Sequence, residues 1–354
     1  MKPRVIIDSH IPYAAGALEP HAEVHYLSGE AITRAVCLDA DALVVRTRTL
    51  CNEQLLRGTS VRLIASATVG TDHIDTNYCA AHGIKYSNAA GSNAWAVVQW
   101  VVSALLYIEK HSAKSIYEST VGIVGAGAIG QKLADTLELF GIRCLRNDPP
   151  RAEMGEKGLV DLATIGREAD IITLHTPLTT TGKHPTAHLI GRTFLHQLGK
   201  RPIIINAARG GVADEYELLE ALDYRRIRGY ILDTYETETD IPTEVIEQAL
   251  LSTPHIAGYS IEGKQKATEQ ALQAVAEFFG FERPAPSAQT PGDPKRFVNG
   301  YSLSDLAQYY DISADSRALR LQPQNFESLR NHYQYRHDWR GFDIGNPRLR
   351  ALIG

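Results

Sequence analysis

The segment Thr120–Gly130 constrains this chain more than any other. It has the sequence TVGIVGAGAIG, in which β-prone apolar residues lead into the pattern G-x-G-x-x-G, and an amphipathic helical pattern follows from Gln131. In a dinucleotide-binding loop, Gly125 makes the tight turn, Gly127 lets the backbone approach a pyrophosphate, and Gly130 lets the helix pack on the strand. The N-terminus of the helix then faces the anion. The segment predicts a strand, a phosphate-binding turn and a helix.

An acidic residue follows this loop at the spacing that a nucleotide site needs. About 20 residues beyond the glycines, Arg143–Asp148 has the pattern of a second strand that ends in an acid. A carboxylate there accepts hydrogen bonds from a ribose diol and repels a 2′-phosphate, which favours NAD over NADP. We therefore predict NAD as the cofactor, with Ile129 inside the fingerprint as part of its site. We predict no metal site.

Bulk properties narrow the function classes. The chain has 354 residues, enough for two or three domains, and its net charge of −5 gives no sign of a nucleic-acid or membrane-surface partner. The four cysteines, Cys37, Cys51, Cys79 and Cys144, are scattered and form no C-x-x-C motif. This usage is typical of a reduced, cytoplasmic protein. The most apolar stretch, residues 94–108, is too short to span a bilayer and is interpreted as a buried helix.

Two blocks of the chain alternate short apolar runs with helical patterns. Such alternation predicts a parallel sheet with helices on both faces in each block. The predicted strands are 5–8, 23–27, 42–46, 63–67 and 84–87 in the first block, and 120–124, 143–148, 171–175, 203–206 and 230–232 in the second. The main predicted helices are 94–110, 215–222, 243–249 and 260–279.

These blocks suggest a discontinuous first domain. We predict a substrate-binding domain from residues 1–95 and 259–283, an NAD-binding domain at 96–258, and a cleft between them. Proline, glycine and serine indicate a linker that begins near 284. The remaining residues to 354 are rich in tyrosine and arginine, which suits an interface, so we predict a C-terminal dimerisation module and a homodimer. The alternative is a solvated appendage.

Three ionisable residues of the second block follow predicted strand ends, where ligands bind in open α/β sheets. Hydride transfer with a 2-hydroxy acid needs a cation for the carboxylate, a base for the hydroxyl proton and a group that tunes the base. Arg209 can grip a carboxylate in bidentate fashion, and His255 can move a proton near neutral pH. Glu238 beside His255 would favour imidazolium and fix its tautomer. Glu236 and Asp240 compete with Glu238 for this role.

In these motifs the chain resembles the D-isomer-specific 2-hydroxyacid dehydrogenases. The matching segments are the fingerprint 125–130 with Asp148, the arginine motif 206–211, the histidine segment 254–258 and the GTDHID motif 70–75. The resemblance implies two doubly wound domains, the second of Rossmann type. It also implies that Arg209, Glu238 and His255 are the catalytic set, with His255 as acid and base.

The same resemblance implies further contacts. Thr47, Thr68 and Tyr259 would contact the substrate. The residues implied to line the NAD site are Thr176, Ala207, Ala208, Asp233 and Gly258. Gln99 stands where many relatives carry glutamate and is interpreted as a packing residue.

Within the family, the likeness is greatest to members that oxidise a phosphorylated hydroxy acid in pyridoxal phosphate biosynthesis. It is carried by residues 8–13, 148–151 and 255–264 and by the C-terminal extension. A phosphate needs cations, and the candidates are Arg46, Arg48, Lys264 and tail arginines of a second subunit. If the stretch from Arg46 to Arg48 is extended, both arginines share one face.

Two other functions stay open. One is oxidation of an unphosphorylated D-2-hydroxy acid such as glycerate or lactate. The other is a non-catalytic NAD-binding regulator, against which the intact set of Arg209, Glu238 and His255 argues.

Overall fold

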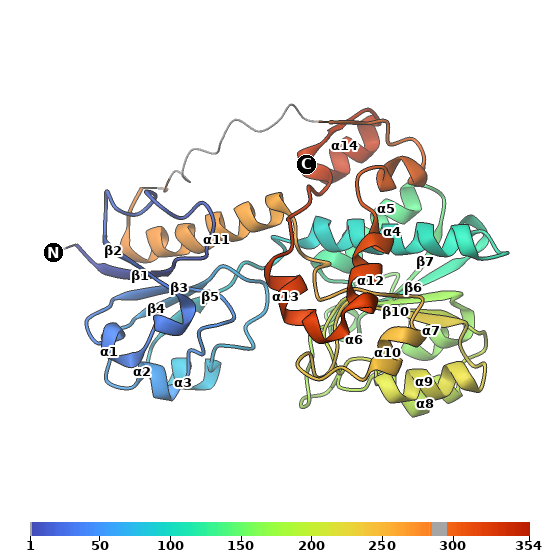
Figure 1. Cartoon of the computed structure of the whole chain (residues 1–354), viewed down its shortest axis with the longest axis horizontal. Helices are drawn as coiled ribbons and strands as arrows, with labels where there is room; N and C mark the ends of the chain where they lie inside the picture. The colour runs from blue at the N-terminus through green and yellow to red at the C-terminus, as the bar shows by residue number, and fades with distance from the viewer. Residues whose placement is uncertain (1, 283, 285–295) are drawn as a thin grey trace. The chain divides into compact units, whose positions relative to one another are not determined.

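The computed structural model describes residues 2–282, 284 and 296–354. They form two compact units. The first contains the described residues up to Asn93 and those from Ser260 to 284, and the second contains Ala94–Tyr259 and Arg296–Gly354. Each unit has its own parallel sheet (Figure 1), so the prediction of two parallel α/β sheets is confirmed. The predicted linker begins near 284. Apart from Pro284, its residues up to 295 are not among the described residues.

The first unit is built on a five-stranded parallel sheet in the order β2-β1-β3-β4-β5. Its strands are β1 (Arg4–Asp8), β2 (Glu23–Leu27), β3 (Ala42–Val45), β4 (Leu63–Ser66) and β5 (Lys85–Ser87). Its helical elements are η1 (Gly29–Ala31), α1 (Arg34–Cys37), α2 (Glu53–Leu56), α3 (Thr76–Ala81) and α11 (Ile261–Phe279).

Helices cover both faces of this sheet. Leu43 and Val45 of β3 pack on the side of α1, α2 and α3, whereas Ala42 and Val44 pack on the side of α11. All four are fully buried. A strand buried on both faces has no polar positions to alternate with, which is why the sequence of β3 is one continuous apolar run.

The second unit is built on a six-stranded parallel sheet in the order β11-β10-β9-β8-β6-β7. Its strands are β6 (Thr120–Val124), β7 (Arg143–Asn147), β8 (Ile171–Leu174), β9 (Ile203–Asn206), β10 (Gly229–Leu232) and β11 (Leu251–Ser252). Its helical elements up to Tyr259 are α4 (Ala94–His111), η2 (Ile116–Glu118), α5 (Ala128–Leu139), α6 (Pro149–Glu153), α7 (Leu162–Glu168), α8 (Arg192–His196), α9 (Glu215–Asp223) and α10 (Thr243–Gln248).

The strand order of this sheet reverses next to β6. The chain passes from β6 to β7 on one side and then to β8 on the other. Helices α4 and α5 cover one face, and α7, α8, α9 and α10 cover the other (Figure 1). In an open α/β sheet, ligands bind outside the carboxyl ends of the strands at such a reversal.

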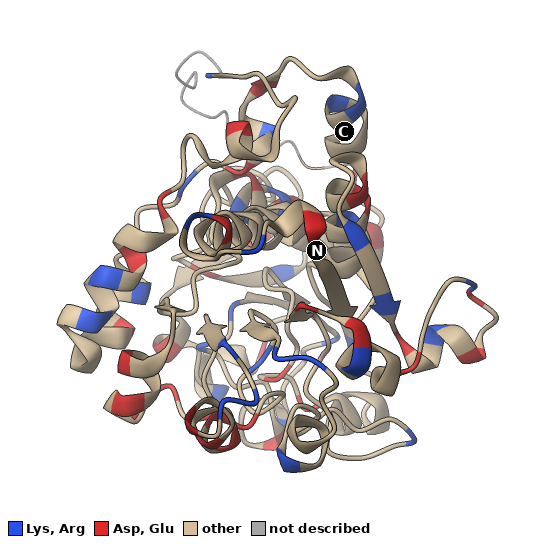
Figure 2. Cartoon of the chain, turned by 90° about the vertical axis from the view of Figure 1, so that its right-hand side faces the viewer, with Lys and Arg blue, Asp and Glu red and all other residues tan. Residues whose placement is uncertain are grey.

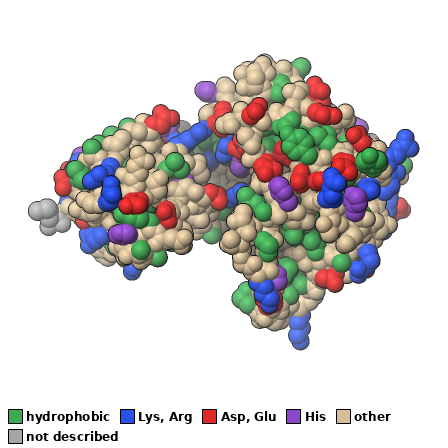
Figure 3. Space-filling model, turned by 90° about the horizontal axis from the view of Figure 1, so that it is seen from below, with side chains coloured by type: hydrophobic (Ala, Val, Ile, Leu, Met, Phe, Trp, Pro, Cys, Tyr) green, Lys and Arg blue, Asp and Glu red, His purple; other side chains and the backbone are tan. Residues whose placement is uncertain are grey.

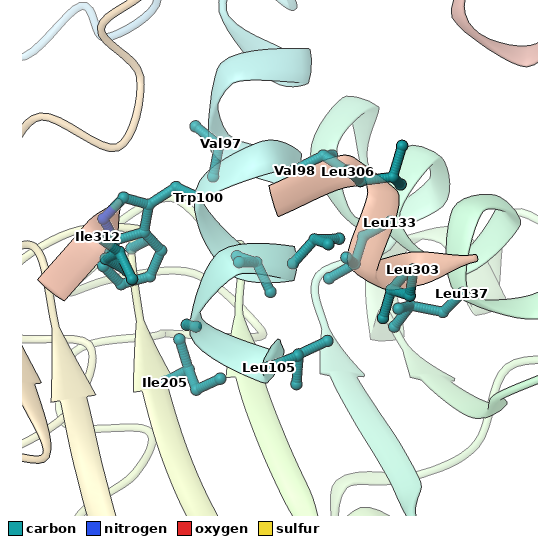
Figure 4. Close-up of a cluster of buried hydrophobic side chains, with 14 of the residues drawn as sticks. Val97, Val98, Trp100, Leu105, Leu133, Leu137, Ile205, Leu303, Leu306 and Ile312 are labelled. Atoms are coloured by element: carbon teal, nitrogen blue, oxygen red, sulfur yellow. The ribbon is translucent and has the colours of Figure 1, made fainter. Parts of the chain in front are cut away.

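The C-terminal residues are part of the core of the second unit. Their elements are β12 (Phe297–Val298), η3 (Leu303–Ala307), α12 (Ile312–Leu321), η4 (Pro323–Asn325), α13 (Phe326–Asn331), η5 (Trp339–Gly341), β13 (Asp343–Ile344) and α14 (Pro347–Ile353). Leu303, Leu306 and Ile312 join the apolar cluster of α4 and α5 (Figure 4). The C-terminal segment is therefore not a solvated appendage.

The surface carries mixed charge. Figure 2 shows basic and acidic residues interspersed over the ribbon, and Figure 3 shows hydrophobic side chains in small groups among charged ones on the face that it draws. Among the described residues, no helix is long and apolar enough to cross a membrane.

Candidate active site

The loops that follow β6, β8, β9, β10 and β11 emerge at one edge of the six-stranded sheet, because its strands are parallel and aligned. The register pairs Leu232 at the end of β10 with Asn206 of β9 and with Ser252 of β11. Parallel neighbours therefore deliver distant parts of the sequence to the same carboxyl edge.

The glycine loop after β6 has the shape that the fingerprint predicts. Gly125 has φ +95°, and a Cβ atom there would lie 2.7 Å from the carbonyl of His175. A Cβ on Gly130 would lie 1.9 Å from the Gly125 oxygen, so only glycine fits. Gly127, the N-cap of α5, has no heavy atom within 4 Å of its virtual Cβ, which leaves that side open. Ile129 is partly buried against the core of the unit.

Asp148 lies beside this loop. One of its carboxylate oxygens accepts a hydrogen bond from the Ala126 N–H at 3.0 Å, and the other accepts from the Arg151 N–H at 3.2 Å, which caps α6. Its side chain is 17% exposed. The carboxylate therefore stands next to the open side of the glycine loop, where a ribose bound there would lie; the contact itself stays a prediction.

Three buried polar atoms near this edge lack a hydrogen-bond partner among the described residues. They are the hydroxyl oxygens of Thr176 and Thr234 and the Nδ1 atom of His175. These residues directly follow β8 and β10, and an unpaired buried polar group is costly unless a ligand or water satisfies it. Together with the open glycine loop, they fit a polar dinucleotide. Ala207 and Ala208 are buried at the end of β9.

His255 and Glu238 are in direct contact. The His255 Nδ1 atom forms a short hydrogen bond with Glu238 Oε1, and the two side chains are 28% and 23% exposed. Burial alone would raise the pKa of Glu238, but the hydrogen bond to His255 and the charges of His255, Arg330 and Arg209 hold that pKa below its ordinary value. An ionised carboxylate only accepts hydrogen bonds, so Nδ1 is the donor and Nε2 is left to accept a proton.

Glu236 and Asp240, the alternatives to Glu238, do not contact His255. Glu236 is exposed and lies 3.2 Å from the ring of His188, and Asp240 is exposed. Among the three acids, Glu238 is thus the partner of the histidine.

Hydrogen bonds to the side chain of Asp233 hold the segment that carries His255 in place. The Asp233 carboxylate is fully buried and accepts hydrogen bonds from the Thr253 hydroxyl and from the N–H groups of Ile256 and Ala257. His255 itself has φ +55°, a left-handed conformation that costs on the order of 1 kcal/mol for a non-glycine residue. Asp233 was predicted to line the NAD site, and the structure also gives it this supporting role.

Arg209 lies on the neighbouring loop after β9. Asn206 accepts from the Ala208 N–H at 3.1 Å and donates to the Arg209 carbonyl at 3.0 Å, which fixes the turn. Gly210 passes so close to Tyr235 that a Cβ would lie 1.8 Å from the Tyr235 oxygen. The arginine and the Glu238 loop are therefore packed backbone against backbone, and the charge of Arg209 acts on Glu238.

Comparisons with known proteins agree with this geometry. Residues 93–257 match the model of the NAD binding domain of D-isomer specific 2-hydroxyacid dehydrogenases. Erythronate-4-phosphate dehydrogenase of Bacteroides fragilis is 41% identical over 339 residues, which cover 95% of this chain and 97% of that protein. The enzyme of that name from Pectobacterium atrosepticum is 38% identical over 353 residues, 96% of this chain and 93% of that protein.

The chain belongs to the D-isomer specific 2-hydroxyacid dehydrogenase family.

This dehydrogenase shares its fold with solved relatives. D-lactate dehydrogenase of Aquifex aeolicus, solved with NAD and lactic acid, has a TM-score of 0.61 at 24% identity and covers 78% of this chain and 95% of its own. A glyoxylate reductase of Paecilomyes thermophila has a TM-score of 0.66 at 21% identity and covers 81% and 99%. The chain is an NAD-binding oxidoreductase of this family.

The C-terminal segment of this dehydrogenase contributes contacts to the site that the sequence did not indicate. Arg330 of α13 donates to Glu238 Oε2 at 2.7 Å and to the Tyr259 hydroxyl at 3.2 Å. Tyr259, predicted to contact substrate, packs edge-on against Tyr333 and Tyr335. The abundance of arginine and tyrosine in the tail was the only signal in the sequence.

Arg336 is the second unexpected residue. Its buried guanidinium donates to the carbonyls of Ala96, Ile256, Ala257 and Tyr259 at 2.7–3.1 Å. It also donates to Gln99 Oε1 at 2.9 Å, and Gln99 donates to the His337 carbonyl at 3.0 Å. Gln99, interpreted as a packing residue, is thus a polar anchor for the C-terminal segment.

The predicted residues of the first unit have their own local structure. β3 ends at Val45, and the Thr49 N–H bonds back to the Arg46 carbonyl, so Arg46–Arg48 is not extended and the predicted shared face is wrong. Arg46 forms a two-pronged ion pair with the buried Asp8 at 2.9 and 3.3 Å. Thr47 is exposed in the turn, and Thr68 bonds to Ser66 Oγ at 2.7 Å.

Proposed function

We propose that this dehydrogenase oxidises 4-phospho-D-erythronate to 2-oxo-3-hydroxy-4-phosphobutanoate with NAD, a step of pyridoxal 5′-phosphate biosynthesis. The support is that proteins named erythronate-4-phosphate dehydrogenase match this chain along almost their whole length. The observation that carries the chemistry is the contact of His255 with the ionised Glu238, with Arg209 on the adjacent loop. A non-catalytic regulator has no need for this set.

In the proposed reaction the protein handles one proton and one carboxylate. Arg209 binds the C1 carboxylate and stabilises negative charge that develops on the C2 oxygen. His255 Nε2 takes the C2 hydroxyl proton, and Glu238 stabilises the imidazolium that results. The C2–H bond breaks as its electron pair leaves with the hydrogen, so the alcohol becomes a 2-oxo group and one proton remains on His255 for release to solvent.

NAD, when bound, accepts the hydride from C2. The residues that would hold it are the glycine loop Gly125–Gly130, Asp148 at the adenosine ribose, and the segments at Thr176, Ala207–Ala208, Asp233 and Gly258. Asp148 would accept hydrogen bonds from the ribose hydroxyls and repel a 2′-phosphate.

We assign substrate binding to the first unit and the coenzyme to the second. In this assignment Thr47 and Thr68 of the first unit would contact the substrate, together with Arg209 and Tyr259, which lie in the second unit. Arg46 is a weaker candidate for the phosphate than the sequence suggested, because the buried carboxylate of Asp8 already neutralises it. Arg46→Ala and Arg48→Ala should be compared for KM with 4-phosphoerythronate and with erythronate. The phosphate ligand is the arginine whose loss raises KM for the phosphorylated acid alone.

A homodimer and a cytoplasmic location complete the proposal. Exposed aromatic side chains of the C-terminal segment offer contact area for a second copy: Phe297, Tyr301, Tyr309 and Tyr335 are 38–63% exposed. All four cysteines are free thiols, which suits a reducing compartment. Sedimentation of the purified chain tests the assembly, and a monomer across the micromolar range would contradict it.

The activity is tested by following NADH absorbance with a panel of 2-hydroxy acids. The panel is 4-phosphoerythronate, erythronate, glycerate and lactate, each as the D-isomer. We expect kcat/KM to be highest for 4-phosphoerythronate. Equal values for the phosphorylated and unphosphorylated erythronates would overturn the substrate assignment, and no turnover of any acid would favour the regulator.

A further inference from the structure

The carboxylate of Glu238 lies between the side chains of His255 and Arg330. Its Oε1 atom bonds to His255, and its Oε2 atom accepts a hydrogen bond from Arg330 Nη1 at 2.7 Å. Arg330 is only 18% exposed, and its Nε atom donates to the Tyr259 hydroxyl. The guanidinium is therefore held by two hydrogen bonds, one from Nη1 to Glu238 and one from Nε to Tyr259.

We propose that Arg330 is a positioning residue that shares the negative charge of Glu238 with His255 and so lowers the pH at which the histidine is free to accept the substrate proton. This inference rests on the proposed function, because it takes His255 as the base.

The direction follows from electrostatics. Glu238 favours the imidazolium form, and a second cation on the same carboxylate draws part of that stabilisation away and repels the imidazolium directly. Other charged and titratable groups lie near Glu238, His255 and Arg330. The acids Asp233, Glu215 and Glu327 favour the imidazolium form, whereas Arg209 disfavours it; Tyr259 is the other partner of Arg330. Arg330 differs from them in holding the second oxygen of Glu238 itself.

The geometry also explains why an arginine serves better than a lysine. One guanidinium edge reaches Glu238 while the Nε atom reaches Tyr259. A lysine ammonium is a point charge on a flexible stem and cannot hold two separated acceptors in one plane. Arg330→Lys should therefore keep the charge but loosen the orientation of Glu238.

The test is the pH profile of kcat/KM for alcohol oxidation. In Arg330→Gln the acid limb should move to higher pH by about 0.5–1 unit, the size that a nearby unit charge produces at a partly exposed site. Arg330→Lys should move it by less than half as much. Arg317→Gln is the matched control, because Arg317 also lies in the C-terminal segment but is 66% exposed and pairs with Asp311; its profile should coincide with that of the wild type.

A merely structural role would lower the plateau of activity and leave the midpoint in place. An unchanged or lower midpoint in Arg330→Gln overturns the proposal. If the glutamine variant does not fold, Arg330→Met, which keeps the apolar stem, is measured instead. A titration of the His255 ring by NMR without substrate gives the same midpoint shift independently of turnover. If the wild type oxidises no hydroxy acid, the proposed function fails, whereas the NMR shift still decides the role of Arg330.

Discussion

Arg336 should be one of the most sensitive positions for stability. Replacing it with methionine removes hydrogen bonds to four backbone carbonyls and to Gln99 Oε1, all of them in the buried junction between α4, the His255 loop and the C-terminal segment. Breaking a buried charged network costs about 3–5 kcal/mol, because acceptors are left without a donor. That is a large fraction of the roughly 5–15 kcal/mol by which a folded domain is stable.

Urea unfolding followed by fluorescence measures this loss, with the midpoint as the readout because a two-unit chain need not unfold in one step. Arg320→Met is the matched control. Arg320 also donates to two carbonyls, those of Ala249 and Leu250, but it is exposed, so its loss should cost at most about 1 kcal/mol. A loss below about 1 kcal/mol for Arg336→Met as well would refute the account of the buried network.

The remaining predictions concern the site and the pH dependence of stability. Asp148→Ala should narrow the preference for NAD over NADP in kcat/KM, and a wild type that uses both equally would contradict its assignment. His255→Ala should lower kcat by about 10²-fold or more, and Glu238→Gln should reduce activity far more than Glu236→Gln, since only Glu238 touches the histidine; equal, small effects would exclude both acids. Burial, together with nearby acids, raises the pKa of Glu215 to about 7. As the pH rises from about 4.5 to 7, the unfolded chain ionises there first, so the folded state loses about 2–3 kcal/mol. Glu215→Gln should remove this loss, and urea midpoints that fall equally between pH 5 and pH 8 in both proteins would contradict it.

The elements that the sequence predicted well are those with long apolar runs or strong caps. Strand β9 has the predicted limits. Its three isoleucines and Asn206 are all buried, Pro202 comes directly before them, and a turn that contains Gly210 follows. Strand β11 has only two residues and carries no periodicity. Helix α12 was missed because its charged face outweighs its buried positions. The predicted range 42–46 runs one residue past the end of β3 into a turn. For the same reason, the prediction that Arg46 and Arg48 share one face of an extended stretch is wrong.

The site divides along the same line. The glycine loop and Arg209 follow predicted strands, so a local pattern placed them at one edge, whereas His255 follows β11, which was not among the predicted strands. Arg330 lies 92 residues from Glu238 in sequence, and a single chain gives no sign of such a pairing. The residue pattern alone left Glu238 and Glu236 open, and the family resemblance favoured Glu238; in the structure both acids occupy the same loop, and Glu238 is the one that contacts His255.

The interleaved order of the two units has a consequence for synthesis of the chain. The strands of the first unit are made within the first 87 residues, but one face of their sheet is covered by Ala271, Leu272 and Val275 of α11. When residues 1–93 leave the ribosome, Val5, Ile7 and Val44 can pack on that face only against nearby residues such as Ile11 and Leu18, because α11 has not yet been translated. A nascent sheet with one face only partly covered is prone to aggregation. The first unit is therefore completed only after the six-stranded sheet of the second unit has been made, although its own strands are made first.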